Sequence, residues 1–393
     1  MGMKKMVQDT AAKVYQHLYD RHRAAALKQA DRKPGILFAS VSRAEIGGNA
    51  KFVYDRICQR GLDKHFDVVL DFAPDIKSVE TPAAQLAFVK RLAQADIIFL
   101  DDYHPFVYFI DFPADVKVVQ LWHAIGSFKT IGFSRKRPNQ EEHRRTSRAH
   151  RGYTHVIVSA EVDRPHYADA FNAPIENIYA TGIPRVDGFL DEASLSAARA
   201  AFFRKFPQAT GKRVIVFAPT FREDDIRKAT YDFSQLDFAA IASYCRANNA
   251  LFMLKFHQYT HGFVGVPAGM DDVIVLADGI REVNDLLPAA DLLITDYSSV
   301  LYEAALIDVP TVFFPYDLEE YESTRGFYEP YESFVPGPIV CTPDALVQAL
   351  SFTGDQAQID AFKHRHFAHF DNHSSDRVVD LVLETKEGSL AHD

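Results

Sequence analysis

The sequence predicts an α/β protein of two Rossmann-like domains that face a cleft, preceded by an extra N-terminal helix. Three observations lead to this prediction. A chain of 393 residues is longer than one hydrophobic core usually serves. Apolar strands alternate with helical stretches in two separate series, the order typical of doubly wound parallel sheets. A polar, alanine-rich stretch divides the two series.

The first 33 residues lack a strand pattern and carry apolar side chains at helical spacing among Lys, Arg and His. We therefore expect an amphipathic helical segment over 1–33. Its apolar face has two open interpretations, which are packing on the first domain and contact with an anionic membrane surface.

The first domain is expected over 34–190, where strand and helix patterns alternate. Its expected helices lie at 49–60 and 80–94, and its expected strands are GILFAS, FDVVLDF, ADIIFLDD, VKVVQLWHA and THVIVSAE. The repeated strand-then-helix order indicates a parallel sheet.

The second domain is expected over 205–365, after the alanine-rich stretch LDEASLSAARAAFFRKFP. Its expected helices lie at 234–248 and 281–289, and its expected strands are KRVIVFAPT, ALFMLKFHQ, DDVIVLAD, DLLITD and PTVFFPY. Helices dominate the sequence after about residue 342, and 366–393 is expected to form a C-terminal helix and tail. Ligands of open α/β sheets bind beyond the carboxyl ends of strands, so polar residues that follow strands are the candidate site.

Composition narrows the classes of partner. The chain has 43 Lys and Arg against 53 Asp and Glu, a formal net charge of −10, which argues against nucleic acid as the main partner. Three widely separated cysteines without CxxC spacing indicate a reducing compartment. Neither a long apolar run nor a signal-peptide core is present, so we expect a protein kept in the cytoplasm.

A hydroxyl-rich turn follows one strand of the second domain. The stretch 291–338 reads as a buried strand, a polar turn, a helix and a second buried strand, which places Asp296, Ser298 and Ser299 in the turn. Free backbone N–H groups and the positive end of a helix dipole favour an anion there. Alternatively, these side chains could simply cap the helix that starts near Val300.

Four further polar residues follow predicted strands. His123 follows VKVVQL, and because imidazole titrates near neutrality it is a candidate general base, with a structural histidine as the alternative. Arg222 follows VIVFAPT, and its guanidinium could fork onto a phosphate. Lys255 and His257 follow LFML and add two cationic donors.

A basic segment contrasts with the acidic whole. Its candidate contact residues are Arg135, Lys136, Arg137, Arg144, Arg145 and Arg148. The segment is either a solvated charged loop or a contact with anionic lipid or a pyrophosphate-bearing lipid. Asp101 and Asp102 support a metal only weakly, since they could equally end a strand. The sequence has no HExxH motif, no Walker A loop and no zinc spacing.

Seven ordered motifs resemble the CDP-glycerol-dependent glycerophosphotransferases of teichoic acid and related polyol-phosphate polymer synthesis. They span about residues 96–340 and are LDDYHPF, QLWHAIGSFKTIGFSR, ATGIPRVD, FAPTFR, LKFHQ, NDLLPAADLLITDYSSVLYE and YDLEEYESTRGFYEPYESFVPGPIV. The resemblance implies a GT-B-like fold and a monotopic enzyme, peripheral on the inner face of the cell membrane. It also implies transfer of glycerol phosphate from CDP-glycerol to a polyprenyl-diphosphate-linked glycan or a polyol-phosphate acceptor, with release of CMP.

The resemblance also implies roles for individual residues. His123 is similar to the family's catalytic base, and His257 to its second essential histidine. The implied donor-binding residues are Arg222, Lys255, Asp296, Ser298 and Ser299 for the pyrophosphate and Glu303 for the ribose. Protein cations and a helix terminus could replace a metal, so we expect no cofactor and no obligatory metal.

This chain departs from the family pattern at two positions. Gln258 stands where the family often has proline, and Glu303 stands where polymerases often have Asp. Alternative functions are a CDP-ribitol-dependent transferase, a glycosyltransferase that uses a sugar nucleotide, and a non-catalytic nucleotide- or lipid-binding scaffold. The sequence leaves open whether the enzyme is a primase, a polymerase or a capsule enzyme, and whether it forms a homo-oligomer.

Overall fold

The protein folds into two compact α/β units. The computed structural model describes residues 2–136, 139–222, 227–257, 260–277, 279–280 and 282–383, with side chains described from residue 10 onward. Unit 1 comprises the described parts of Met1–Ser127, Ile131–Asp187 and Ala368–Asp393, and unit 2 those of Phe128–Thr130 and Gly188–Phe367. Each unit has its own parallel sheet and its own apolar core. The prediction of two Rossmann-like domains with an extra N-terminal helix is confirmed.

The sheet of unit 1 is parallel, with strand order β2-β1-β3-β4-β5-β6. Its described strands are β1 (Gly35–Ser40), β2 (Asp67–Phe72), β3 (Ile97–Leu100), β4 (Lys117–Gln120), β5 (His155–Ile157) and β6 (Ile178–Tyr179). The sequence predicted each of these except the two-residue β6. The strand order reverses between β1 and β3, and such a switch point leaves a crevice at the carboxyl ends of the two strands.

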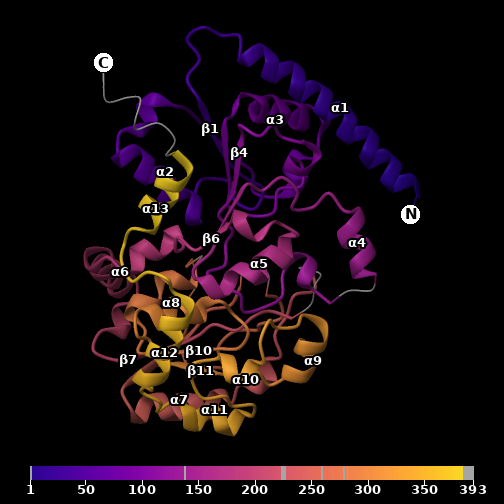
Figure 1. The fold of residues 1–393 in the computed structure, drawn as a ribbon. Helices are drawn as coiled ribbons and strands as arrows, with labels where there is room; N and C mark the ends of the chain where they lie inside the picture. Colours follow the sequence, from indigo (N-terminus) through magenta and orange to yellow (C-terminus); the bar gives the residue numbers. More distant parts are fainter. Residues whose placement is uncertain are drawn as a thin grey trace. The chain divides into compact units, whose positions relative to one another are not determined.

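Helices of unit 1 pack on this sheet and on one another (Figure 1). They are α1 (Gly2–Ala26), α2 (Gly48–Gln59), α3 (Pro82–Gln94), α4 (Gln140–Thr146), α5 (Arg164–Phe171) and α13 (Ser374–Leu383). The N-terminal α1 lies along α3, where Tyr19 is only 1% exposed and Arg23 donates to the carbonyl of Ala95 at 3.0 Å. Of the two interpretations of its apolar face, packing on the first domain is therefore confirmed.

The C-terminal helix α13 belongs to unit 1, although unit 2 lies between it and the rest of unit 1 in the sequence. Figure 1 shows α13 beside α2, which it contacts. The two oxygens of the buried Asp187 carboxylate accept hydrogen bonds from the backbone N–H groups of Ser374 and Ser375, each at 2.8 Å. Asp187 thus satisfies donors in the first turn of α13, which a helix cannot satisfy by itself.

Asp187→Ala is expected to loosen α13, because removing such a cap costs about 0.5–2 kcal/mol of stability. Hydrogen exchange of the amides in 374–383 should become faster than in the parent protein. The matched control is Asp355→Ala, since Asp355 caps α12 of unit 2 through Ala357 and Gln358. The control should speed exchange in α12 and leave α13 unchanged; unchanged exchange of α13 in Asp187→Ala would contradict the capping role.

The sheet of unit 2 is also parallel, with strand order β11-β10-β7-β8-β9. Its strands are β7 (Arg213–Phe217), β8 (Ala250–Leu254), β9 (Ile274–Leu276), β10 (Leu292–Thr295) and β11 (Thr311–Phe313). The described helices of this unit are α6 (Glu192–Lys205), α7 (Phe238–Ala247), α8 (Val300–Leu306), α9 (Leu318–Thr324), α10 (Tyr331–Phe334), α11 (Pro343–Ala349) and α12 (Gln356–His366). Here the strand order reverses between β7 and β10, which places the switch point beside the predicted polar turn.

One helix prediction in unit 2 is wrong. Of the stretch predicted over 281–289, the described residues 282–289 form two short 3-10 helices, Val283–Asp285 and Leu287–Ala289, in place of one α-helix. Pro288 has no backbone N–H and its ring would clash within a continuing helix, which explains the interruption. The predicted helix at 234–248 is present in shorter form as α7. Of the predicted C-terminal tail, residues 384–393 lie outside the described residues.

Candidate active site

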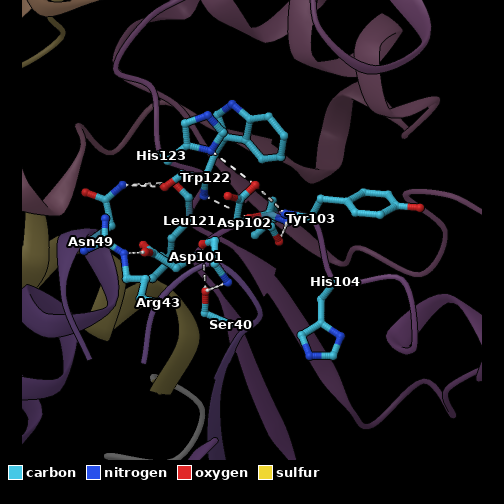
Figure 2. Close-up of polar contacts among 12 residues, drawn as sticks. Ser40, Arg43, Asn49, Asp101, Asp102, Tyr103, His104, Leu121, Trp122 and His123 are labelled. Carbon is cyan, nitrogen blue, oxygen red and sulfur yellow. Dashed lines mark hydrogen bonds and ion pairs between the residues drawn. The ribbon is translucent and has the colours of Figure 1, made fainter. Parts of the chain in front are cut away.

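His123 lies just beyond the carboxyl end of β4 in unit 1, next to the end of β3. The register pairs Leu100 of β3 with Gln120 of β4, so the residues that follow both strands are neighbours. The Nδ1 atom of His123 lies 3.3 Å from Oδ1 of Asp102, and the His123 side chain is 51% exposed (Figure 2). This geometry leaves Nε2 of the imidazole as the proton acceptor.

Neighbouring charges set the protonation of this pair. Desolvation lowers the pKa of His123, but Asp102 and the more distant Asp101 more than offset it, so that the pKa is raised above its usual value. Arg185 opposes that rise. Burial raises the pKa of Asp102. The charge and the hydrogen bond of His123 lower it by more, so that the pKa of Asp102 lies below its ordinary value. The two side chains therefore favour the ionised pair.

Asp101 is oriented differently from Asp102, toward the start of α2. Its carboxylate lies 3.2 Å from Nε of Arg43 and accepts from the backbone N–H of Ala50 at 3.3 Å. Burial raises its pKa to about 6 despite Arg43. Gly48 permits this approach: it has φ of +54°, and a Cβ there would lie 3.0 Å from the carboxylate. The weak metal interpretation gains nothing from this arrangement, because Asp101 and Asp102 serve different partners.

In unit 2, two of the predicted donor-binding residues share one recess with the second predicted histidine. Lys255, His257 and Ser298 line a hollow of about 180 Å³ together with Glu282. Lys255 follows β8 and Ser298 follows β10, so the recess lies at the carboxyl end of the sheet. Burial lowers the pKa of Lys255 and of His257. The negative charge of the nearby Glu282 opposes this shift in both residues. An anion in the recess would stabilise the protonated form of both side chains.

The Ser298–Ser299 turn combines features of both sequence interpretations. The hydroxyl of Ser298 accepts from the backbone N–H of Val300 at 3.3 Å, which is a local capping contact. Ser299 occupies the N-cap position of α8 but makes no side-chain capping bond. Both serines are half-buried.

Arg222 makes internal contacts rather than pointing into open space. It donates to Asp317 through Nε at 2.5 Å and Nη2 at 2.8 Å, and its Nη2 lies 3.0 Å from Asp296. Its third nitrogen donates to the carbonyl of Thr220. Although burial lowers the pKa of Arg222, Asp296 and Asp317 raise it above its ordinary value. Two carboxylates of the protein therefore hold the guanidinium of Arg222, and its phosphate contact stays a prediction.

Tyrosine rings complete the enclosure of this guanidinium. Its carbon lies 4.9–5.6 Å from four ring centroids, those of Tyr231, Tyr297, Tyr316 and Tyr321. Aromatic faces attract cations electrostatically, which adds to the ion pairs. Asp296 is only 1% exposed and also accepts from the backbone N–H groups of Thr220 and Tyr297. The cluster thus fixes the residues that precede the Ser298–Ser299 turn.

Glu303, the residue predicted to hold the ribose, contacts a side chain of its own unit. It lies within α8 and is 1% exposed. One of its oxygens accepts from the side-chain amide of Asn284 at 3.2 Å. In this arrangement Glu303 supports the 3-10 turn Val283–Asp285 beside the recess.

Two arginines of the basic segment form ion pairs within unit 1. Arg144 lies 2.8 Å from Asp169, and Arg148 lies 3.1 Å from Asp111. Arg144 also donates to the carbonyl of Phe133 at 3.2 Å. These two side chains stabilise the fold of the segment, whatever else they contact.

Other residues of the basic segment lie closer to solvent. Lys136 and Arg145 are exposed and Arg135 is half-buried, while Arg137 lies outside the described residues. Arg135 and Lys136 border a wide surface hollow of about 590 Å³ next to α4. Within the part of the chain that the structure describes, no helix is long and apolar enough to cross a membrane.

Two doubly wound units, one with a His–Asp pair and one with a cationic recess, define an α/β protein whose candidate ligand sites lie at the carboxyl ends of its strands. Residues 22–384 match the CDP-Glycerol:Poly(glycerophosphate) glycerophosphotransferase family, and the chain belongs to that family. This is the family that the sequence motifs predicted.

Two curated relatives illustrate this membership. The teichoic acid ribitol-phosphate polymerase TarL of Staphylococcus aureus is 40% identical over 88% of this chain and 61% of its own length. The teichoic acid poly(ribitol-phosphate) polymerase of Bacillus spizizenii is 37% identical over 90% of this chain and 56% of its own length. The chain therefore spans about three fifths of these two relatives.

A solved structure shows the same fold. A variant of the wall teichoic acid polymerase TagF soaked with CDPG superposes with a TM-score of 0.73 at 20% identity, covering 97% of each chain. At this level of identity the similarity establishes the fold alone.

Proposed function

We propose that this protein transfers a polyol phosphate from a CDP-linked polyol to a hydroxyl group of a glycan or polyol-phosphate acceptor, with CMP as the leaving group. The observation that carries the proposal is the half-exposed imidazole of His123 beside Asp102. A general base needs an accessible nitrogen and a partner that stabilises the protonated ring, and this pair offers both. Membership of the family supports the class of donor.

The proposed chemistry is an in-line displacement at the phosphorus that carries the polyol. A new bond forms between this phosphorus and the acceptor oxygen, while the bond from phosphorus to the bridging oxygen breaks. Nε2 of His123 takes the acceptor proton, and CMP leaves with the electron pair of the broken bond. Catalysis of phosphoryl transfer rests mostly on positioning and on stabilisation of charge.

The donor diphosphate is assigned to the recess of unit 2. Lys255 and His257 supply cationic or hydrogen-bonding groups, and the Ser298–Ser299 turn supplies hydroxyl groups and the N-terminal end of α8. We assign Arg222 and Glu303 to positioning, because the first holds Asp296 and the second holds Asn284. Since the recess already contains protein cations, the proposal requires no obligatory metal.

We propose CDP-ribitol as the first candidate donor. The support is the identity of 40% and 37% to two ribitol-phosphate polymerases. CDP-glycerol, the donor expected from the sequence, becomes the second candidate; the family description supports it. A lipid-linked acceptor at the inner face of the membrane completes the proposal, with the exposed Lys136 and Arg145 as candidate contacts.

The test is release of CMP by the purified protein given CDP-ribitol or CDP-glycerol, each with and without a lipid-linked acceptor analogue. Acceptor-dependent release from CDP-ribitol, with slower release from CDP-glycerol, is the expected result. The reverse preference would replace the donor and keep the class of reaction. Release from neither donor would overturn the proposal, and turnover of a sugar nucleotide instead would make the protein a glycosyltransferase.

Asp102→Asn is expected to shift the acidic limb of the kcat/KM profile to lower pH. In the parent protein Asp102 and Asp101 raise the pKa of His123 against the effect of Arg185, so the base is neutral only above that raised value. Loss of the Asp102 charge lowers the pKa and moves the limb with it. The value of kcat/KM on the plateau above this limb should fall as well, because the His123 ring loses the partner that orients it. An unmoved limb would show that another group controls it.

A further inference from the structure

Asn49 connects three segments of unit 1 through one buried side chain. It is the second residue of α2 and is 1% exposed. Its Nδ2 donates to the carbonyl of Trp122 at 2.6 Å and to that of Leu121 at 3.3 Å, as Figure 2 shows. Its Oδ1 accepts from the backbone N–H of Arg185 at 3.0 Å. No role in catalysis follows from its position in the sequence alone.

The residues that Asn49 contacts form an unusual backbone turn. Trp122 has φ of +55°, in the left-handed region that a bulky residue rarely adopts. Such a conformation persists only when its surroundings impose it. On one side the Oε1 atom of Gln120 accepts from the Trp122 N–H at 2.9 Å, and on the other side Asn49 holds the Trp122 carbonyl. Side chains thus hold both the backbone N–H and the backbone carbonyl of Trp122.

This turn determines where the imidazole lies. His123 directly follows Trp122, and the two rings are 4.6 Å apart between centroids. A change in the Trp122 dihedral angles would move the His123 ring relative to Asp102, which belongs to the end of the neighbouring strand. Asn49 also fixes the backbone of Arg185, a cation that acts on His123.

We infer that Asn49 is a positioning residue: its amide holds the left-handed turn at Trp122 and thereby sets the His123 ring against Asp102. The inference deepens the proposed function and rests on it for the catalytic consequence. Its structural part, the placement of the ring, does not depend on which donor the enzyme uses.

The experiment measures the pKa of His123 directly, by NMR of protein labelled in its histidine rings, with His123→Gln to assign the signal. In Asn49→Ala the ring should leave Asp102, and its pKa should fall toward that of free imidazole. In the same variant kcat should fall about 10-fold to 100-fold, the effect of a misplaced catalytic group, with KM for the donor little changed. Asn49→Ser, which retains one hydrogen-bond donor, should lie between the parent protein and Asn49→Ala.

The matched control is Thr154→Val. The Thr154 hydroxyl also connects a side chain to backbone of β4, since it accepts from the N–H of Val118 at 2.8 Å, but it contacts neither Leu121 nor Trp122. This variant should lower Tm while the His123 pKa and kcat stay at parent values. It therefore separates general loss of stability from loss of ring position.

Three outcomes would overturn the inference. One is a folded Asn49→Ala protein with the parent pKa of His123. Another is an equal loss of kcat in Thr154→Val. The third is failure of both Asn49 variants to fold where Thr154→Val folds, since Asn49 would then serve stability alone. If instead His123→Gln keeps its turnover while Asn49→Ala shifts the His123 pKa, the proposed base is wrong and the positioning role stands.

Discussion

His123→Gln is expected to lower kcat for CMP release by about 10²–10⁴-fold, the usual contribution of a general base. Glutamine has a similar size but cannot take the acceptor proton near neutral pH. Because the His123 side chain is 51% exposed, the variant should keep the fold and the Tm of the parent protein. KM for the donor should change little, since the proposed donor contacts lie in unit 2.

The chain offers a matched control for this variant in His373. Its Nδ1 lies 3.1 Å from Asp376, and its side chain is 60% exposed, so it forms a second exposed His–Asp pair in unit 1. His373→Gln should retain the parent kcat. Near-normal turnover in His123→Gln would remove His123 as the base, whereas an equal loss in both variants would point to a general effect of removing a surface histidine.

Arg222→Met is expected to destabilise the protein by about 3–5 kcal/mol, because it leaves two carboxylates without their buried cationic partner. Asp296 is 1% exposed and the side chain of Asp317 is 15% exposed, so water cannot replace the guanidinium fully. The four tyrosine rings would also lose the cation that they surround. Urea unfolding followed by circular dichroism measures the effect as a lower midpoint.

Arg246→Met serves as the control for the Arg222 prediction. Arg246 also forms a two-pronged contact with a carboxylate, donating to Asp272 at 3.0 and 2.6 Å, but both side chains are about half-exposed. Exposed ion pairs contribute little, so the midpoint should shift only slightly. If both variants lose stability equally, burial of the Arg222 cluster is not what makes it strong.

Much of the fold was predictable from local patterns. The strand GILFAS is apolar nearly throughout, and the corresponding β1 is buried along its whole length. By contrast, β6 has two residues, which are too few to show a hydrophobic period in the sequence. The helix predicted over 281–289 contains Pro288, which a continuing α-helix does not accommodate. The sequence also contains no local signal that α13 packs in unit 1, since that depends on a contact between Asp187 and Ser374.

The site was predictable to the extent that strand ends reveal it. His123, Lys255, His257 and Ser298 all follow strands, and three of them line one recess. The enclosure of Arg222 was not predictable, because Asp317 lies 95 residues away in sequence.

The residues that position His123 could not be predicted from the sequence either. Asp102 stood in a noted motif, but its pairing with His123 follows only from the register of β3 and β4. Asn49 looked like an ordinary residue at the start of a helix. Long-range pairing, rather than residue type, decides these roles.

The return of α13 to unit 1 has a consequence for synthesis on the ribosome. Unit 1 needs residues on both sides of unit 2, whereas unit 2 lies almost entirely within Gly188–Phe367. At about 5–20 residues per second, the ribosome takes roughly 10–40 s to proceed from Asp187 to Ser374. During that interval the nascent unit 1 exposes the side of α2 that α13 will cover. During synthesis, unit 2 should therefore complete its folding before unit 1. A recombinant fragment of unit 1 needs residues 368–383 linked to the chain that ends at Asp187.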